Sequence, residues 1–171
     1  VKGGPLDRDE VIKARRLEMD YFKKMGVYSK VPRAEATGCG AKVITTKWVD
    51  TNKGSEAEPN YRSRLVGREL NLSDRPDLFA ATPPLESLRY IVSRCASAQH
   101  RQRPHRILSI DVSRAYFYAK SIRQVFIQIP GHDRLPEDEG KVGRLNLSLY
   151  GTRDAAQNWA VEYTKTEGRG I

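Results

Sequence analysis

The stretch from Arg106 to Lys120, RILSIDVSRAYFYAK, decides the fold expected for this chain, because a run of apolar residues leads directly to a single aspartate. Ile107, Leu108 and Ile110 favour a short strand, and Asp111 would end it. An aspartate at a strand end is either a solvated carboxylate or a metal ligand, since a sheet fixes the direction of the side chain there. The rest of the chain has to distinguish these two interpretations.

The composition fits a folded, basic protein. The 171 residues suit about one domain, and a hydrophobic content of 39% favours a folded protein over a disordered chain. Lys and Arg number 30 against 21 Asp and Glu, which gives a net charge of +9. This charge favours a nucleic acid or another polyanion as partner. No apolar run has the length of a membrane span, so we expect an intracellular protein that is not secreted and has no membrane partner.

The cysteines give little information about function. Cys39 and Cys95 lie far apart in the sequence and indicate no disulfide framework. Cys95, His100 and His105 are spaced as in part of a zinc motif, but a fourth ligand is missing. The alternative, a small apolar side chain on a helix face, fits the pattern around Cys95 better.

The first third of the chain has clear local signals. Asp7 and Glu10 fit a capping box and Gly26 fits a helix end, so a helix is predicted between Asp7 and Gly26. That helix either binds a partner or packs on its own domain, and packing is the more common case. β-Branched residues then flank a turn rich in Gly, Pro and Asn, which predicts a β-hairpin from Val43 to Leu70.

The rest of the chain alternates helices with short strands. A Thr-Pro-Pro start predicts a helix with one apolar stripe: Leu85, Leu88, Ile91, Val92 and Cys95. Strands are predicted in ILSID, QVFIQIP and KVGRLNLSLYG, and a last helix in RDAAQNWAVEYTK. Between Ser87 and Ile110 there are five arginines and no acidic residue, which adds to the basic character. The mixture of helices and antiparallel strands predicts the α+β class.

Several segments, in this order, resemble the reverse transcriptase domain of copia-type retrotransposon Pol polyproteins. The matching pieces are KWVD, YRSRLVGREL, LFAATPPLESLR, IDVSRAYFYA, VFIQIPG and LSLYGTRDAAQNW. They cover the chain from about Thr46 to Trp159. The resemblance implies the fingers and part of the palm of a right-hand polymerase, preceded by an N-terminal helix and lead-in. The domain division expected on this basis is residues 1–40 and residues 41–171.

The resemblance implies a metal-dependent active site. A polymerase of this kind holds two Mg²⁺ ions on carboxylates, to activate the primer 3′-hydroxyl and to stabilise the leaving pyrophosphate. Asp111 matches the first aspartate ligand of the family and is the expected catalytic residue. Val112 is expected to add its backbone carbonyl to the same metal.

The resemblance also implies a deoxynucleotide site. The backbone N–H groups of Arg114 and Ala115 are expected near the nucleotide phosphates, and the Tyr116 ring beneath the sugar, where it excludes a 2′-hydroxyl. Gly151 is expected to permit close backbone approach to the nucleotide and the template. The hairpin resembles the fingers that close over the triphosphate, with Arg62 and Arg64 as first choices among four expected phosphate ligands: Lys47, Arg62, Arg64 and Arg68.

The chain departs from the family pattern at three places. Leu147 stands where the family usually has a Lys, and residues 154–156 replace a common Gln-Ala-Pro, which affects contacts on the template side. The family carries its other metal ligands in a tyrosine–any–aspartate–aspartate hairpin, and this sequence has no Asp-Asp pair. We therefore expect a segment truncated before that motif and inactive as a polymerase by itself.

Two interpretations follow. In the first, the chain is part of an RNA-directed DNA polymerase, whose partners are a primed RNA or DNA template, deoxynucleoside triphosphates and the rest of the polyprotein, with its C-terminal palm and RNase H. It would act in a cytoplasmic particle or the nucleus. In the second, the chain is a decayed or repurposed relic that at most binds nucleic acid through its basic surface.

Overall fold

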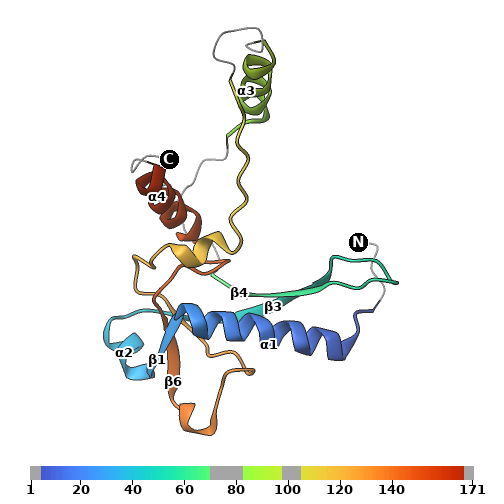
Figure 1. The fold of residues 1–171 in the computed structure, drawn as a ribbon. Helices are drawn as coiled ribbons and strands as arrows, with labels where there is room; N and C mark the ends of the chain where they lie inside the picture. The colour runs from blue at the N-terminus through green and yellow to red at the C-terminus, as the bar shows by residue number, and fades with distance from the viewer. Residues whose placement is uncertain (1–4, 70–82, 98–104, 168–171) are drawn as a thin grey trace.

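A computed structural model describes residues 5–69, 83–97 and 105–167 (Figure 1). Helices alternate with strands, and most strand pairs are antiparallel, in agreement with the predicted mixture of α and β structure. The elements, in order, are α1 (Arg8–Met25), β1 (Tyr28–Pro32), α2 (Arg33–Gly38), β2 (Val43–Ile44), β3 (Thr46–Asn52), β4 (Tyr61–Gly67), α3 (Leu85–Ser97), the 3₁₀ helix η2 (Ala115–Tyr118), β5 (Phe126–Ile127), the 3₁₀ helix η3 (Pro136–Asp138), β6 (Lys141–Leu145) and α4 (Ala155–Glu167).

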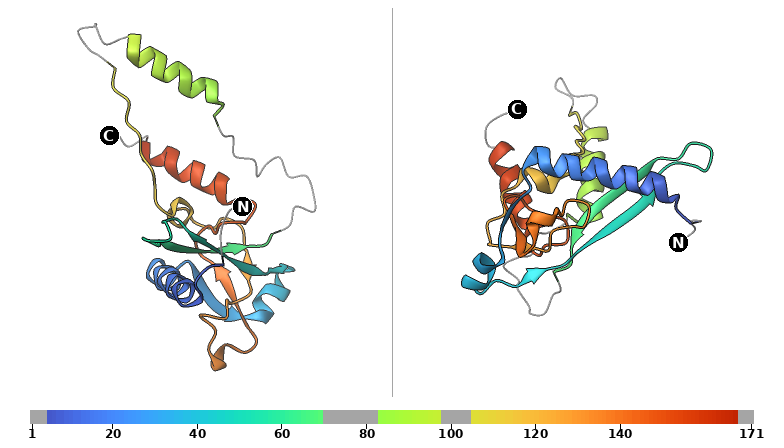
Figure 2. Two further views of the ribbon diagram at one scale, coloured as in Figure 1. Left: turned by 90° about the vertical axis from the view of Figure 1, so that its right-hand side faces the viewer. Right: turned by 90° about the horizontal axis from the view of Figure 1, so that it is seen from below.

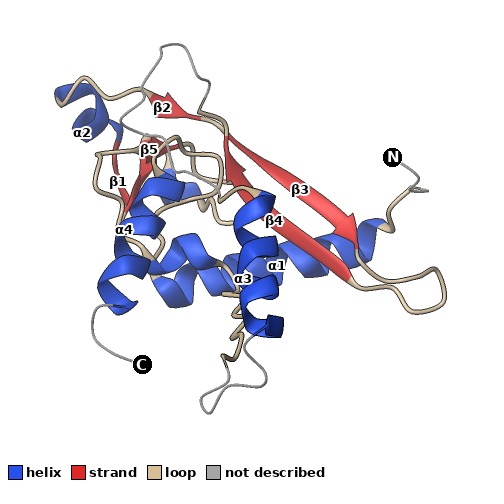
Figure 3. Ribbon diagram, turned by 90° about the horizontal axis from the view of Figure 1, so that it is seen from above, coloured by secondary structure: helices blue, strands red, loops and turns tan. Residues whose placement is uncertain are grey.

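The first helix begins and ends at the predicted residues. The Asp7 side chain accepts hydrogen bonds from the backbone N–H groups of Asp9 and Glu10, and Gly26 ends α1 in the left-handed conformation, with φ of 64°. Met19 and Phe22 bury their side chains in the core. The helix runs along the β3–β4 hairpin and packs on β4, so it packs on its own domain (Figure 1 and Figure 3).

The strands form two sheets. One has the order β1-β6-β5-β2, in which β2 and β5 are parallel and the other neighbours are antiparallel. The other is the predicted hairpin of β3 and β4, with Trp48 opposite Leu65 and Asp50 opposite Ser63. This face of the hairpin meets α1, because Arg15 of α1 forms an ion pair of 2.7 Å with Asp50.

One continuous core joins the two sheets and α1. Phe22 of α1 and Phe117 of η2 stack edge to face, with ring centroids 4.9 Å apart. Leu65 of β4 and Ile127 of β5 are buried in the same cluster, together with Leu149. Segments that are distant in the sequence therefore meet beneath η2, the element that follows Asp111.

The predicted strand ending at Asp111 is wrong. Residues 105–112 form an extended segment without a ladder, and Ile107, Leu108 and Ile110 are exposed. A strand needs a neighbour for its backbone N–H and C=O groups. In the part of the chain that the structure describes, no strand lies beside this segment, because β5 and β6 pair with β2 and β1 instead.

Helix α3 forms as predicted but stands away from the rest of the molecule (Figure 2). None of its residues is buried, and the expected stripe of Leu85, Leu88, Ile91 and Val92 is exposed. The helical period was therefore interpreted correctly, although the stripe covers no core in this structure.

Two general findings concern the described residues alone. No helix among them combines the length and the apolar character needed to cross a membrane. Cys39 and Cys95 are not joined in a disulfide. His100, one of the residues spaced as in part of a zinc motif, lies outside the described residues.

Candidate active site

Asp111 lines a cavity of about 300 Å³ between its own segment and α4. Val112 and Ala115 line this cavity from one side, and Trp159 and Tyr163 line it from α4. Asp111 is exposed, whereas Val112 and Ala115 are half-buried. The carboxylate is therefore open to solvent and borders a space that a ligand can enter.

A tight turn connects Asp111 to η2. Arg114 caps η2 in the left-handed conformation, with φ of 54° and ψ of 41°, and its carbonyl accepts a hydrogen bond of 2.9 Å from Phe117 N–H. Phe117 is fully buried, so it anchors the turn in the core. The turn thereby holds Ala115 at the same cavity as Asp111.

Tyr116 belongs to an aromatic stack that reaches the hairpin. The centroid of its ring lies 4.8 Å from that of the Tyr150 ring. The guanidinium of Arg64, on the hairpin, lies 5.5 Å from the centroid of the same Tyr150 ring. Burial raises the pKa of Tyr150 above its ordinary value, although the nearby Arg64 acts in the other direction. Tyr150 thus connects two residues predicted for the same site. Sequence reasoning missed it, although it lies in the quoted LSLYGTR segment.

Three of the four predicted hairpin cations share one face. Lys47 and Thr51 lie on one side of β3, and the strand positions opposite Thr51 and Val49 are Arg62 and Arg64. Residues directly opposite one another in an antiparallel pair point to the same face, as do alternate residues in a strand. Lys47, Arg62 and Arg64 therefore lie on the face opposite α1, and Arg64 lies on the side of Tyr150.

Arg68 lies elsewhere. Its backbone N–H donates to the carbonyl of Thr45 at 2.8 Å, and its side chain lines a cavity of about 490 Å³. Lys42, Arg123 and Arg153 line the same cavity, with Glu69 as the acidic residue among them. This basic cavity, defined by these residues, is separate from the cavity beside Asp111.

Gly151 makes a close backbone contact, but with the protein itself. Its φ is 81°, and a Cβ atom there would lie 2.1 Å from the carbonyl oxygen of Gly67. The Gly67 N–H donates to the Tyr150 carbonyl at 2.7 Å. A glycine is therefore required here to join the end of β4 to the segment before α4, whatever further role it has.

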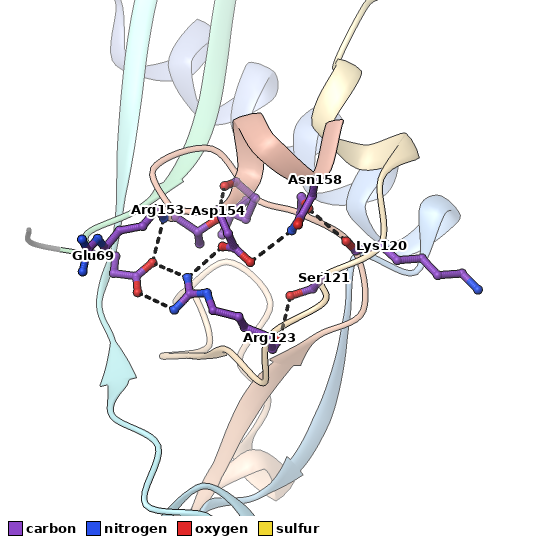
Figure 4. Close-up of polar contacts among 10 residues, drawn as sticks. Glu69, Lys120, Ser121, Arg123, Arg153, Asp154 and Asn158 are labelled. Atoms are coloured by element: carbon purple, nitrogen blue, oxygen red, sulfur yellow. Dashed lines mark hydrogen bonds and ion pairs between the residues drawn. The ribbon is translucent and has the colours of Figure 1, made fainter. Parts of the chain in front are cut away.

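A partly buried ionic network, drawn in Figure 4, supports the basic cavity. Arg123 donates two hydrogen bonds to Glu69, at 3.1 and 3.0 Å, and one to Asp154 at 2.8 Å. The bond to Asp154 is the largest cause that raises the pKa of Arg123. Burial opposes ionisation of Asp154, but the hydrogen bonds from Arg123 and Asn158 lower its pKa nonetheless.

The network explains one departure from the family pattern. Asp154 lies in place of the usual Gln, is buried, and joins Arg123 to the first turn of α4 through Asn158, at 3.1 Å. A buried carboxylate needs such partners, because an unpaired charge in the interior is costly. Sequence reasoning missed Arg123 and Glu69, since a single Arg and a single Glu in unrelated segments carry no pattern.

The residues around Asp111 fit part of a magnesium site. Among the described residues, no three or more His, Cys, Asp or Glu side chains gather in a way that could hold a metal ion. Mg²⁺ is often bound through one or two carboxylates, with phosphates and water as its other ligands. The exposed Asp111 carboxylate and the Val112 carbonyl are oxygen groups of this kind, and by themselves they supply only part of such a ligand set.

Comparisons with known proteins identify the family. A family model described as reverse transcriptase (RNA-dependent DNA polymerase) matches residues 31–167. The chain is also 24% identical, over 162 residues, to the retrovirus-related Pol polyprotein from transposon TNT 1-94 of Nicotiana tabacum. That alignment covers 92% of this chain but 12% of the tobacco protein. No solved structure matches the chain. The chain therefore belongs to the reverse transcriptase (RNA-dependent DNA polymerase) family, as a reverse transcriptase domain of the retrotransposon Pol type.

Proposed function

We propose that this chain forms the deoxynucleotide-binding part of an RNA-directed DNA polymerase, made of the fingers and the first part of the palm. One observation carries the proposal. The Asp111 carboxylate and Ala115 share a cavity, and the adjoining Tyr116 is linked through Tyr150 to Arg64 on the hairpin. A carboxylate for a metal, a ring for a sugar and a cation for phosphate are the groups that such a nucleotide site needs.

Each residue then has a chemical role. Asp111 and the Val112 carbonyl would hold magnesium, which when bound would neutralise phosphate charge and activate the attacking hydroxyl. Arg64 and Arg62 would bind phosphate oxygens, since a guanidinium binds them with two parallel hydrogen bonds, and Lys47 would add charge on the same face. Tyr116 would exclude ribonucleotides, because its ring occupies the space of a 2′-hydroxyl.

We also propose that the basic cavity binds a nucleic-acid strand. Lys42, Arg68 and Arg153 line it together with Arg123. Helix α3 carries two further arginines, Arg89 and Arg94, apart from this cavity. The net charge of +9 supports the same partner. This part of the proposal also holds for a relic without catalysis, so binding of nucleic acid alone does not separate the two interpretations.

Nucleotide binding does separate them. Titration of the chain with dTTP and Mg²⁺, followed by NMR, should show saturable binding that Asp111→Asn weakens about tenfold or more, since the variant keeps the shape and removes the charge. Asp20→Asn, which removes an exposed carboxylate of α1, is the matched control and should bind as the parent does. Equal binding by the parent and Asp111→Asn would show that Asp111 is only a solvated carboxylate.

Two further measurements complete the test. Tyr116→Ala should reduce the preference for dTTP over UTP, because it enlarges the sugar pocket, whereas a general lesion would weaken both nucleotides together. Binding of a labelled primed template should weaken as the salt concentration rises. The slope of the logarithm of the binding constant against the logarithm of the salt concentration should become shallower by about one unit in Arg68→Ala, because one phosphate contact is lost. Binding that does not respond to salt would contradict the strand proposal.

A further inference from the structure

Arg114 has a backbone conformation that its own chemistry disfavours. Among the described residues, it is the one non-glycine residue with a positive φ, at 54°. In this region the Cβ atom of an L-residue approaches the following carbonyl oxygen, so an arginine adopts it only when its surroundings hold it there. Arg114 lies between Asp111 and Tyr116, so whatever holds it also shapes the proposed nucleotide site.

Glu18 of α1 provides the main restraint. Its Oε2 atom accepts hydrogen bonds from Arg114 Nε at 3.0 Å and from Arg114 Nη2 at 2.8 Å. The Glu18 side chain is 3% exposed and the Arg114 side chain 29% exposed, so the carboxylate is shielded from water while the guanidinium stays partly in contact with it. The Tyr21 ring lies one turn further along α1, with the Arg114 guanidinium 4.2 Å from its centroid. An anion and an aromatic face therefore fix the same guanidinium from one helix.

The restraint reaches the residues that are proposed to contact the nucleotide. The Arg114 carbonyl accepts the first hydrogen bond of η2, from Phe117 N–H, so the conformation of Arg114 sets the position of that helix. Phe117 packs on Phe22 of α1, and Tyr116 leaves η2 toward Tyr150. The N–H groups of Arg114 and Ala115, and the ring of Tyr116, are thus oriented together.

We infer that Glu18 is a positioning residue for the nucleotide site, acting through the left-handed conformation of Arg114. The inference rests on the proposed function and adds α1 to it. The match to the family model begins at residue 31, so Glu18 lies outside it. The Arg114 side chain is occupied by Glu18, so its backbone, and not its guanidinium, faces the phosphates.

The substitution Arg114→Gly provides the sharpest test, because glycine adopts a positive φ without the cost that a Cβ atom adds. Glu18→Gln should weaken dTTP binding in the presence of Mg²⁺ roughly tenfold, since the competent backbone becomes a minor state. Glu18→Gln combined with Arg114→Gly should bind within about twofold of the parent. Glu18→Gln combined with Arg114→Ala should stay weak, because alanine retains the penalty.

A second control separates positioning from general loss of stability. Asp138→Asn removes another carboxylate whose side chain is 3% exposed, from an ion cluster away from Asp111. It should lower the free energy of unfolding but leave dTTP affinity unchanged. NMR scalar couplings report φ at Arg114 directly, and hydrogen exchange reports the Phe117 N–H bond. In Glu18→Gln we expect φ to leave the left-handed region and Phe117 exchange to accelerate.

The outcomes are distinguishable. The inference would be overturned if Arg114→Gly and Arg114→Ala, each combined with Glu18→Gln, bound dTTP equally well. It would also be overturned if Glu18→Gln left the scalar couplings at Arg114 unchanged. Absence of dTTP binding by the parent would instead overturn the proposed function, whatever the couplings show. The inference would be supported if Arg114→Gly, but not Arg114→Ala, restored the dTTP affinity of Glu18→Gln, and if Asp138→Asn bound dTTP as tightly as the parent.

Discussion

Two regions of this molecule carry similar apolar sequence patterns and have opposite environments. In the body, by which we mean α1, η2 and the two sheets, Phe117 is 0% exposed. In the arm, by which we mean α3 and residues 105–110, Leu108 is 73% exposed and Leu88 is 55% exposed. An apolar pattern thus specifies a local conformation, but burial also requires a neighbour that supplies the other half of the contact.

The largest effect should come from the aromatic cluster of the body. Phe117→Ala removes a fully buried ring that packs on Phe22 and Tyr150, and should lower the free energy of unfolding by about 3–5 kcal/mol. The matched change in the arm, Leu108→Ala, should cost less than about 0.5 kcal/mol. Urea unfolding of both variants measures the contrast, and similar losses would contradict it.

The second effect concerns the joint between β4 and the segment before α4. Gly151→Ala would place a Cβ atom 2.1 Å from the Gly67 carbonyl oxygen, at a φ of 81°. The variant should lose more than about 2 kcal/mol of unfolding free energy, because the backbone strain of a positive φ adds to the steric overlap of the new Cβ atom with the Gly67 carbonyl. Gly140→Ala is the control: its φ is 73°, but nothing lies within 4 Å, so only the backbone cost of about 1 kcal/mol remains. Equal losses of unfolding free energy in the two variants would mean that the backbone around Gly67 and Gly151 moves apart at no cost to accommodate the new Cβ atom.

These contrasts show what the sequence could predict. The caps of α1, the β3–β4 hairpin and the period of α3 depend on local signals, and all were predicted. The strand ending at Asp111 was predicted wrongly, because a strand forms only where a neighbouring strand pairs with its backbone, and the apolar pattern of one segment does not show whether such a neighbour exists. The predicted roles of Asp111, Val112 and Tyr116 remain predictions.

The residues that sequence reasoning missed are those that act across long separations. Glu18 and Arg114 are 96 positions apart, and Arg123 and Glu69 are 54 apart. Tyr150 was quoted as part of a motif but not chosen, because its contact with Arg64 requires the hairpin to fold over it. No spacing within one helix or strand indicates such pairs, so a structure was needed to find them.

A smaller effect should come from the ion cluster at the far end of the body. Asp138 accepts from Lys30 and from the Leu135 N–H, and these bonds lower its pKa from an ordinary value of 3.8 to about 2. A lowered folded-state pKa stabilises the protein above pH 3.8, and this contribution is lost as the pH falls through about 2. Asp138→Asn should therefore be less stable than the parent at pH 7, and the difference should shrink between pH 4 and pH 2.

Thermal unfolding of the parent and Asp138→Asn across this pH range tests the sign. The exposed Asp20→Asn variant serves as the control and should stay within about 0.5 kcal/mol of the parent at neutral pH. A parent–variant difference that grows as the pH falls would mean that Asp138 is not held as an ion in the folded protein.

The smallest effect is expected in the arm. Leu88→Gln changes an apolar side chain that is already half in water, so the free energy of unfolding should change by less than about 0.5 kcal/mol. Leu65→Gln in β4 makes the same kind of change at a buried position and should cost several times more, because it also buries an amide that lacks a partner. Urea unfolding compares the two variants under the same conditions. If Leu88→Gln costs as much as Leu65→Gln, α3 must pack on the body in solution, and the contrast between arm and body fails. If the cost is negligible, the apolar stripe of α3 contributes nothing to the stability of this chain, as expected for a stripe that covers no core in the structure.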